Sequence, residues 1–175
     1  MTRDGLVGVG VLGAGAWARG AHLPGYKRDP RCRLVAIADV ERGRAAEAAR
    51  EFDIPTVSMD PRELFARDDI DLIDVCTPSH THFELAWGAL EAGKHVLCEK
   101  PVAYDFRETR RAHAFARERG LKTKVGLTFR YSPAMRYMRE LVATGFVAQS
   151  LPPVRRCRQL ANETSKPRRP SWKAR

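Results

Sequence analysis

The sequence is poor in cysteine, and none of its apolar runs is long. Its 175 residues include four cysteines, and no two of them form the Cys-x-x-Cys pair of zinc sites and dithiol redox motifs. Cys76 and Cys98 lie inside apolar stretches, where a reduced cysteine behaves as a small hydrophobe. No stretch has the roughly 20 apolar residues that cross a bilayer, and the glycine-containing N-terminus has no signal-peptide pattern. We therefore expect a cytoplasmic protein that does not bind membranes.

Positive charge is in excess, and it is unevenly distributed. The net charge is +10, but residues 148–175 hold eight Lys/Arg and one acid (+7), whereas residues 1–147 hold 23 and 20 (+3). The tail also has four prolines and no periodicity, which predicts disorder. It is either a basic nucleic-acid-binding arm or the result of a truncation or shifted reading frame near residue 147, and we do not expect specific nucleic-acid recognition. The expected organisation is one domain over 1–147 and a tail over 148–175.

Short apolar runs alternate with amphipathic stretches through the first part of the chain. This alternation predicts an α/β fold with a doubly wound parallel sheet. Asp60 and Asp105 are typical of helix N-caps. Further helices are expected after the first strand and from Ser132 to about Gly145. The predicted strands are 6–13, 34–39, 71–77, 95–100 and 124–129, and the predicted helices between them are 41–52, 61–67, 80–92 and 106–119.

A glycine pattern follows the first predicted strand. Gly13, Gly15 and Ala18 form the G-x-G-x-x-A sequence of a dinucleotide-binding turn. Gly13 would permit the tight turn, and Gly15 would let the backbone approach a pyrophosphate. The phosphates would then lie at the start of the following helix, at Ala16 and Trp17. A plain strand of small residues is the alternative, and the strand–turn–helix context favours the nucleotide site.

An acid at the end of the second predicted strand supports the same site. Asp39 stands where a carboxylate can bind both ribose hydroxyls, and its charge would repel a 2′-phosphate. This favours NAD over NADP, although Arg42 and Arg44 lie near enough to soften the preference. The predicted cofactor is therefore NAD, with NADP as an alternative.

Four segments together resemble the glucose–fructose oxidoreductase, inositol dehydrogenase and rhizopine-catabolism (Gfo/Idh/MocA) family. They are residues 8–25, 36–49, 71–103 and 125–136, and they occur in the order that the family has. The resemblance implies an N-terminal Rossmann domain followed by a C-terminal α/β domain built on an open antiparallel sheet. It also implies oxidation or reduction of a sugar or polyol with NAD(P).

The resemblance also assigns residues to the site. Glu99-Lys100-Pro101 is similar to the family's Glu-Lys-Pro, which implies that Lys100 lies near the nicotinamide and the substrate hydroxyl, with Glu99 holding it in place. A cation there would stabilise a developing alkoxide and could transfer a proton. The alternative is an ordinary surface lysine. By the same resemblance, the remaining cofactor residues are Thr77, Pro78 and His82, in the loop on the nicotinamide side, and Arg130, at the end of the sixth strand.

The sequence departs from the family in its second half. Family members commonly carry D-x-x-x-H in the second domain, and no such motif follows Lys100 here. We therefore expect the second domain to be missing and the family's reaction to be weak or absent in this chain alone. A homo-oligomer is expected only if that domain is present. His80 and His82 lack a third ligand, so no metal is predicted. The alternative function is a non-enzymatic dinucleotide-binding or sensing protein with a basic interaction tail, and a methyltransferase-like Rossmann protein is disfavoured.

Overall fold

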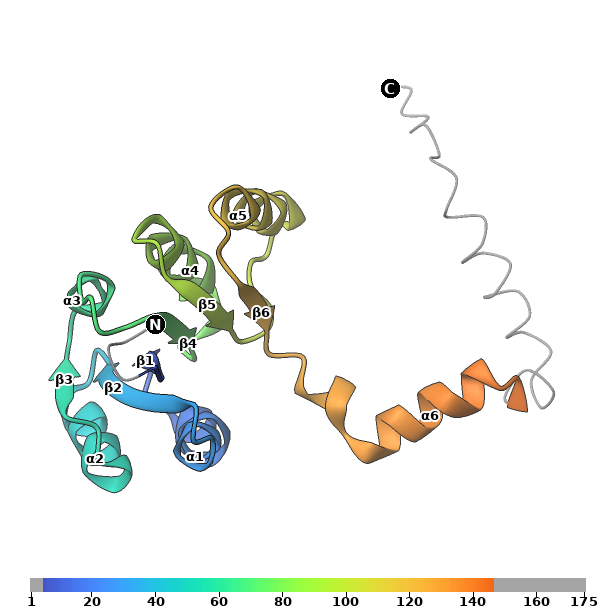
Figure 1. Cartoon of the computed structure of the whole chain (residues 1–175), viewed down its shortest axis with the longest axis horizontal. Helices are drawn as coiled ribbons and strands as arrows, with labels where there is room; N and C mark the ends of the chain where they lie inside the picture. Colours follow the sequence, from blue (N-terminus) through green and yellow to red (C-terminus); the bar gives the residue numbers. More distant parts are fainter. Residues whose placement is uncertain (1–4, 147–175) are drawn as a thin grey trace. The chain divides into compact units, whose positions relative to one another are not determined.

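The computed structural model describes residues 5–146, and the chain divides into two units between Gly126 and Leu127. The first unit contains the parallel sheet with its helices, and the second contains a short turn and one helix (Figure 1). The predicted tail, 148–175, lies outside the described residues. No helix within residues 5–146 has both the length and the apolar character that a membrane span requires.

Six parallel strands form the sheet of the first unit, in the order β3-β2-β1-β4-β5-β6. The chain moves outward from β1 to β3, then crosses back to β4 and moves outward again to β6. The direction of winding therefore reverses between β1 and β4, which confirms the predicted doubly wound fold. The strands are β1 Val7–Leu12, β2 Cys32–Ala38, β3 Thr56–Ser58, β4 Leu72–Val75, β5 His95–Cys98 and β6 Thr123–Val125.

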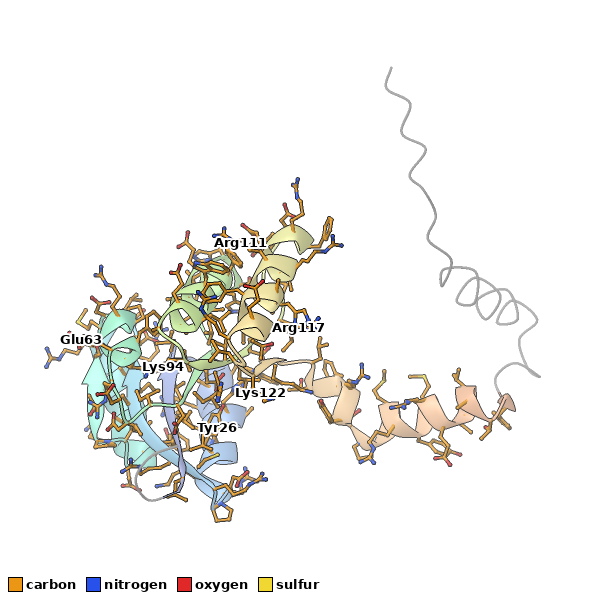
Figure 2. All side chains as sticks on the ribbon, turned by 45° about the horizontal axis from the view of Figure 1, so that its top comes forward. Tyr26, Glu63, Lys94, Arg111, Arg117 and Lys122 are labelled. Carbon is orange, nitrogen blue, oxygen red and sulfur yellow. The ribbon has the colours of Figure 1, made fainter. Side chains whose placement is uncertain are left out.

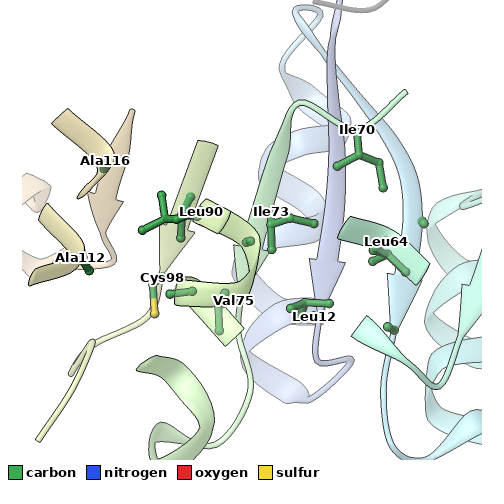
Figure 3. Packing of buried hydrophobic residues seen from close by; sticks show 14 of the residues in the cluster. Leu12, Leu64, Ile70, Ile73, Val75, Leu90, Cys98, Ala112 and Ala116 are labelled. Carbon is green, nitrogen blue, oxygen red and sulfur yellow. The ribbon is translucent and has the colours of Figure 1, made fainter. Parts of the chain in front are cut away.

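Helices cover both faces of this sheet, and each face has its own apolar core (Figure 1). One core joins β1 and β2 to the helices α1 (Leu23–Arg28) and α2 (Arg42–Phe52), and the short helix η1 (Ala18–His22) directly precedes α1. The other joins the sheet to α3 (Pro61–Phe65), α4 (His82–Glu91) and α5 (Phe106–Glu118), and Figure 3 shows its central residues. Burial on both faces explains why the strands are apolar at successive positions.

The helix limits agree with the capping signals in the sequence. The Asp60 carboxylate accepts a hydrogen bond from the Arg62 amide at the start of α3, and Asp105 accepts one from the Arg107 amide at the start of α5. Each bond satisfies an amide that has no partner inside its helix. Both predicted N-caps are confirmed.

Two strand predictions are wrong. β3 was not predicted, because its three residues carry too little periodicity to identify a strand. The strand predicted over 124–129 ends at Val125, and Thr128–Tyr131 forms a 3-10 turn, η3, instead. The neighbouring strand β5 ends at Cys98, so the residues beyond Val125 have no strand to pair with.

The second unit contains η3 and the helix α6 (Pro133–Ala143). Ser132 caps α6 by accepting a hydrogen bond from the Met135 amide, and the helix begins where the sequence predicted. Neither element has a buried residue. The part of this unit that the structure describes therefore has no apolar core of its own.

Candidate dinucleotide-binding site

The glycine turn after β1 is held against the end of β4. Gly13 has φ +95°, and a Cβ atom on it would lie 2.5 Å from the Cys76 carbonyl oxygen. Its amide donates to the Ala38 carbonyl at the end of β2. Glycine is required here both for the left-handed backbone and for the close approach. The turn thus brings three strand ends together.

Gly15, two residues on, has a different environment. A Cβ atom added to Gly15 would meet no atom within 4 Å. This open space belongs to a cleft, which Ala16 and Trp17 also line. A side chain at Gly15 would therefore enter the cleft without disturbing the fold.

Asp39 lies just beyond the end of β2 and is bonded to the glycine turn. One carboxylate oxygen accepts from the Ala14 amide at 2.8 Å, and the other accepts from the Glu41 amide at 2.9 Å. The Arg44 guanidinium lies 3.7 Å from the same carboxylate. Each carboxylate oxygen has a second acceptor position. Asp39 can therefore hold the turn in place and still accept a ribose hydroxyl.

These parts enclose one cleft of about 540 Å³ at the carboxyl edge of the sheet. The volume is within the range of small-molecule sites. The cleft lies at the reversal of strand order, where doubly wound sheets bind ligands. Of the predicted cofactor residues, those that line it are Gly13, Gly15, Ala16, Trp17, Asp39, Thr77 and Pro78.

His82 lies beneath the cleft and does not line it. Its side chain is buried at the start of α4, with Nδ1 2.7 Å from the Pro101 carbonyl oxygen and Nε2 2.8 Å from the Thr77 carbonyl oxygen. The ring therefore ties the Thr77 loop to the loop that contains Lys100. These contacts suit a residue that holds the two loops together, so its assignment as a direct cofactor ligand stays a prediction.

Lys100 and Glu99 follow β5, beside the end of β4. The Glu99 amide donates to the Val75 carbonyl at 2.9 Å, which places the two chain ends next to each other. Lys100 is exposed, whereas the Glu99 carboxylate is buried and accepts from the Lys100 backbone amide at 3.2 Å. Within residues 5–146 the Lys100 ammonium has no ion pair. Glu99 thus contacts the backbone of Lys100, and the ammonium is accessible.

Arg130 lies in η3 of the second unit and not on a strand. Its predicted place near the cofactor stays a prediction. Sequence reasoning missed other residues that line the cleft, among them Val40, Met59 and Pro61 on the β2–β3 side. Val40 and Met59 are exposed apolar side chains. Met59 reaches the cleft only because it follows the unpredicted strand β3, whereas Val40 directly follows Asp39 at the end of the predicted strand β2.

The strand order, the glycine turn and the cleft together define a Rossmann domain of the dinucleotide-binding class. The profile of the oxidoreductase family with an NAD-binding Rossmann fold matches residues 7–127. The chain belongs to this family, the Gfo/Idh/MocA oxidoreductases, as the sequence resemblance predicted.

Curated relatives of this chain include two sugar or polyol enzymes. Inositol 2-dehydrogenase 1 of Saccharopolyspora erythraea is 37% identical over 148 residues, which are 83% of this chain and 42% of the relative. A dTDP-3,4-didehydro-2,6-dideoxy-α-D-glucose 3-reductase of Actinomadura kijaniata is 36% identical over 143 residues, which are 81% of this chain and 42% of the relative.

Solved structures agree with these matches. The A. kijaniata 3-ketoreductase KijD10, in complex with NADP and TDP-benzene, superposes with a TM-score of 0.75 at 35% identity. The match covers 80% of this chain and 43% of that structure. The chain therefore spans about two fifths of the length of the relatives it matches.

Proposed function

We propose that this chain forms the cofactor-binding part of an NAD(P)-dependent oxidoreductase that acts on a sugar or polyol. The observation that carries the proposal is the convergence of the glycine turn, Asp39 and the Thr77 loop on one cleft at the sheet's carboxyl edge. The open space beside Gly15 fits a pyrophosphate, and the free acceptor positions of Asp39 fit a ribose. Relatives named as inositol dehydrogenases and as a sugar ketoreductase support the substrate class.

Within this proposal each group has a distinct task. A bound nicotinamide cofactor would supply the hydride acceptor or donor. Asp39 would hold the adenosine ribose and favour NAD, while Arg44, which lines the cleft, would lessen the repulsion of a 2′-phosphate. The accessible Lys100 ammonium would stabilise negative charge on the substrate oxygen and exchange a proton with it. Its lack of an ion pair among the described residues leaves it available for this task.

Calorimetric titration of NADH into the 175-residue chain tests the cofactor assignment. Gly15→Val should weaken binding by about 30-fold or more, equal to about 2 kcal/mol, because the valine fills the space beside the pyrophosphate. Gly25→Val in α1 is the matched control, since a Cβ there also meets no atom within 4 Å and Gly25 does not line the cleft. Wild-type protein that binds no NADH, or equal affinities in the wild type and Gly15→Val, would contradict the proposal.

The role of Lys100 is tested by its effect on turnover. Residues 1–126 can replace the corresponding segment of the S. erythraea inositol 2-dehydrogenase to give a chimera in which polyol oxidation is measurable. Lys100→Met should lower its kcat by about 10²–10⁴-fold and leave NADH affinity unchanged. Lys124→Met on β6 is the control. If the Lys100→Met chimera keeps the full rate, Lys100 is a surface charge and dinucleotide binding without catalysis is favoured.

A further inference from the structure

A buried cluster of ionisable side chains lies beneath the Lys100 loop, on the sheet face that carries α1. The His22 ring, at the end of η1, is the centre of this cluster. Its Nδ1 lies 2.7 Å from an Asp74 carboxylate oxygen on β4, and its Nε2 lies 3.3 Å from a Glu99 carboxylate oxygen. The three side chains are 7%, 0% and 9% exposed. None of them lines the nucleotide cleft.

Both ring nitrogens of His22 face carboxylates, which only accept hydrogen bonds when ionised. The ring therefore satisfies both contacts as an imidazolium. Burial disfavours this charged form, but the hydrogen bonds that the ring makes to Asp74 and Cys76, together with the electrostatic attraction of these two groups, outweigh it, and the pKa of His22 is raised to about 10. A buried carboxylate without such a partner would be strongly destabilising, so the positive ring is what allows Asp74 and Glu99 to be buried.

The structure around Glu99 is shaped to accommodate this contact. A Cβ atom on Gly126, after β6, would lie 2.2 Å from the Glu99 carboxylate oxygen that faces His22. The other oxygen of Glu99 accepts from the Lys100 backbone amide. A continuous path of contacts thus runs from η1, which follows the glycine turn, through His22 and Glu99 to the Lys100 backbone.

Other groups near His22 complete its surroundings. Tyr26, which Figure 2 labels, comes from α1, and it follows His22 by four positions in the chain. Its hydroxyl and the second Asp74 oxygen are buried without a hydrogen-bond partner among the described residues. Cys76, just after β4, also acts on the ring electrostatically. Asp74 and Glu99 are thus the two carboxylates that hold the charged ring in place.

We propose that His22 is a positioning residue: held as an imidazolium between Asp74 and Glu99, it fixes the Lys100 loop relative to the helix of the glycine turn. The consequence for binding rests on the proposed function, because a dinucleotide would contact both parts at once. The glycine turn would hold the pyrophosphate, and the Lys100 loop would border the nicotinamide end. Loss of the His22 contact should therefore affect the nicotinamide end alone.

Two probes separate the ends of the site. ADP-ribose has the adenosine and both phosphates of NADH and lacks the nicotinamide. We expect His22→Gln to weaken NADH binding by about tenfold and to change ADP-ribose binding by less than about twofold, as measured by titration calorimetry. His113→Gln, at an exposed position of α5, is the matched control and should change neither affinity. Equal weakening of both ligands would show that His22 only supports η1 and would overturn the inference, as would unchanged NADH binding.

A spectroscopic measurement tests the positioning itself without any ligand. In ¹⁵N-labelled protein, His22→Gln should shift the Lys100 backbone amide resonance, because the Glu99 carboxylate that accepts from it loses its partner. Glu99→Gln, which leaves the His22–Asp74 pair intact, should shift the same resonance and give the same NADH-selective loss, and it serves if His22→Gln does not fold. An unmoved Lys100 resonance in a folded variant would overturn the inference. Wild-type protein that binds neither probe would contradict the proposed function, while the resonance would still test the positioning.

Discussion

The two halves of the sheet reach the same edge, but they build their parts of the site differently. At the ends of β1 and β2 the site depends on missing side chains: Gly13 makes room for the Cys76 carbonyl, and Gly15 leaves the cleft open. At the ends of β4 and β5 it depends on buried charge, with His22 between two carboxylates. The first half forms a space for a ligand, and the second fixes the position of a reactive group. The two halves should therefore respond to different perturbations.

Substitution of Gly13 should have the largest effect on stability. Gly13→Ala should lower the free energy of unfolding by about 3 kcal/mol or more, because the methyl group overlaps a backbone carbonyl and the residue has positive φ. Gly15→Ala, next to open space, should change it by less than about 0.5 kcal/mol. Urea denaturation of both variants measures the difference. Equal stabilities of the two variants would mean that the turn after β1 does not require the close approach of Gly13 to the Cys76 carbonyl.

Removal of the Asp39 carboxylate should affect both stability and cofactor choice. Asp39→Ala leaves the Ala14 and Glu41 amides without their acceptor, so we expect a loss of about 2 kcal/mol in stability. NADH affinity should fall, and the ratio of NADPH to NADH affinity should rise because a negative charge is removed. Asp68→Ala, at an exposed site, is the control. An unchanged ratio would show that Asp39 supports the turn without reading the ribose.

High pH should weaken the second half of the site selectively. The pKa of His22 is raised to about 10, above its value of about 6.5 in an unfolded chain, so its stabilisation is complete below about pH 6.5 and is lost as the pH rises through 10. Between about pH 7 and 10 the wild type should lose about 3 kcal/mol more stability than His22→Gln. Burial raises the pKa of Tyr26 above its ordinary value and that of Cys98 to about 12, so neither group should ionise in this range. Parallel pH profiles for the two proteins, from chemical denaturation, would contradict the charged state of His22.

Local signals predicted most of the fold because each depends on neighbouring residues. The apolar runs identified five of the six strands, and the caps at Asp60 and Asp105 marked where helices begin. The errors were β3, which is too short to show periodicity, and the end of β6, which depends on where β5 stops. Strand pairing is a long-range property, so a single segment does not contain that information.

The candidate site was predictable to a similar degree. The glycine spacing and Asp39 indicated the nucleotide cleft, and the family resemblance pointed to Lys100. The cleft residue Met59 was missed because β3, which it follows, had not been predicted.

The sequence by itself determined the alternation of strands and helices, the glycine turn and the family to which the chain belongs, since these are written in short-range spacing and motif order. Only the tertiary structure decided that His22, Asp74 and Glu99 meet in one buried cluster. Asp74 is 52 positions and Glu99 is 77 positions from His22 in the chain, and each of the three alone is an ordinary polar residue. Their charged contact exists because parallel pairing sets β4 beside β5 and because His22, at the end of η1, reaches the carboxylates on both, where low polarity makes an unpaired charge too costly to bury.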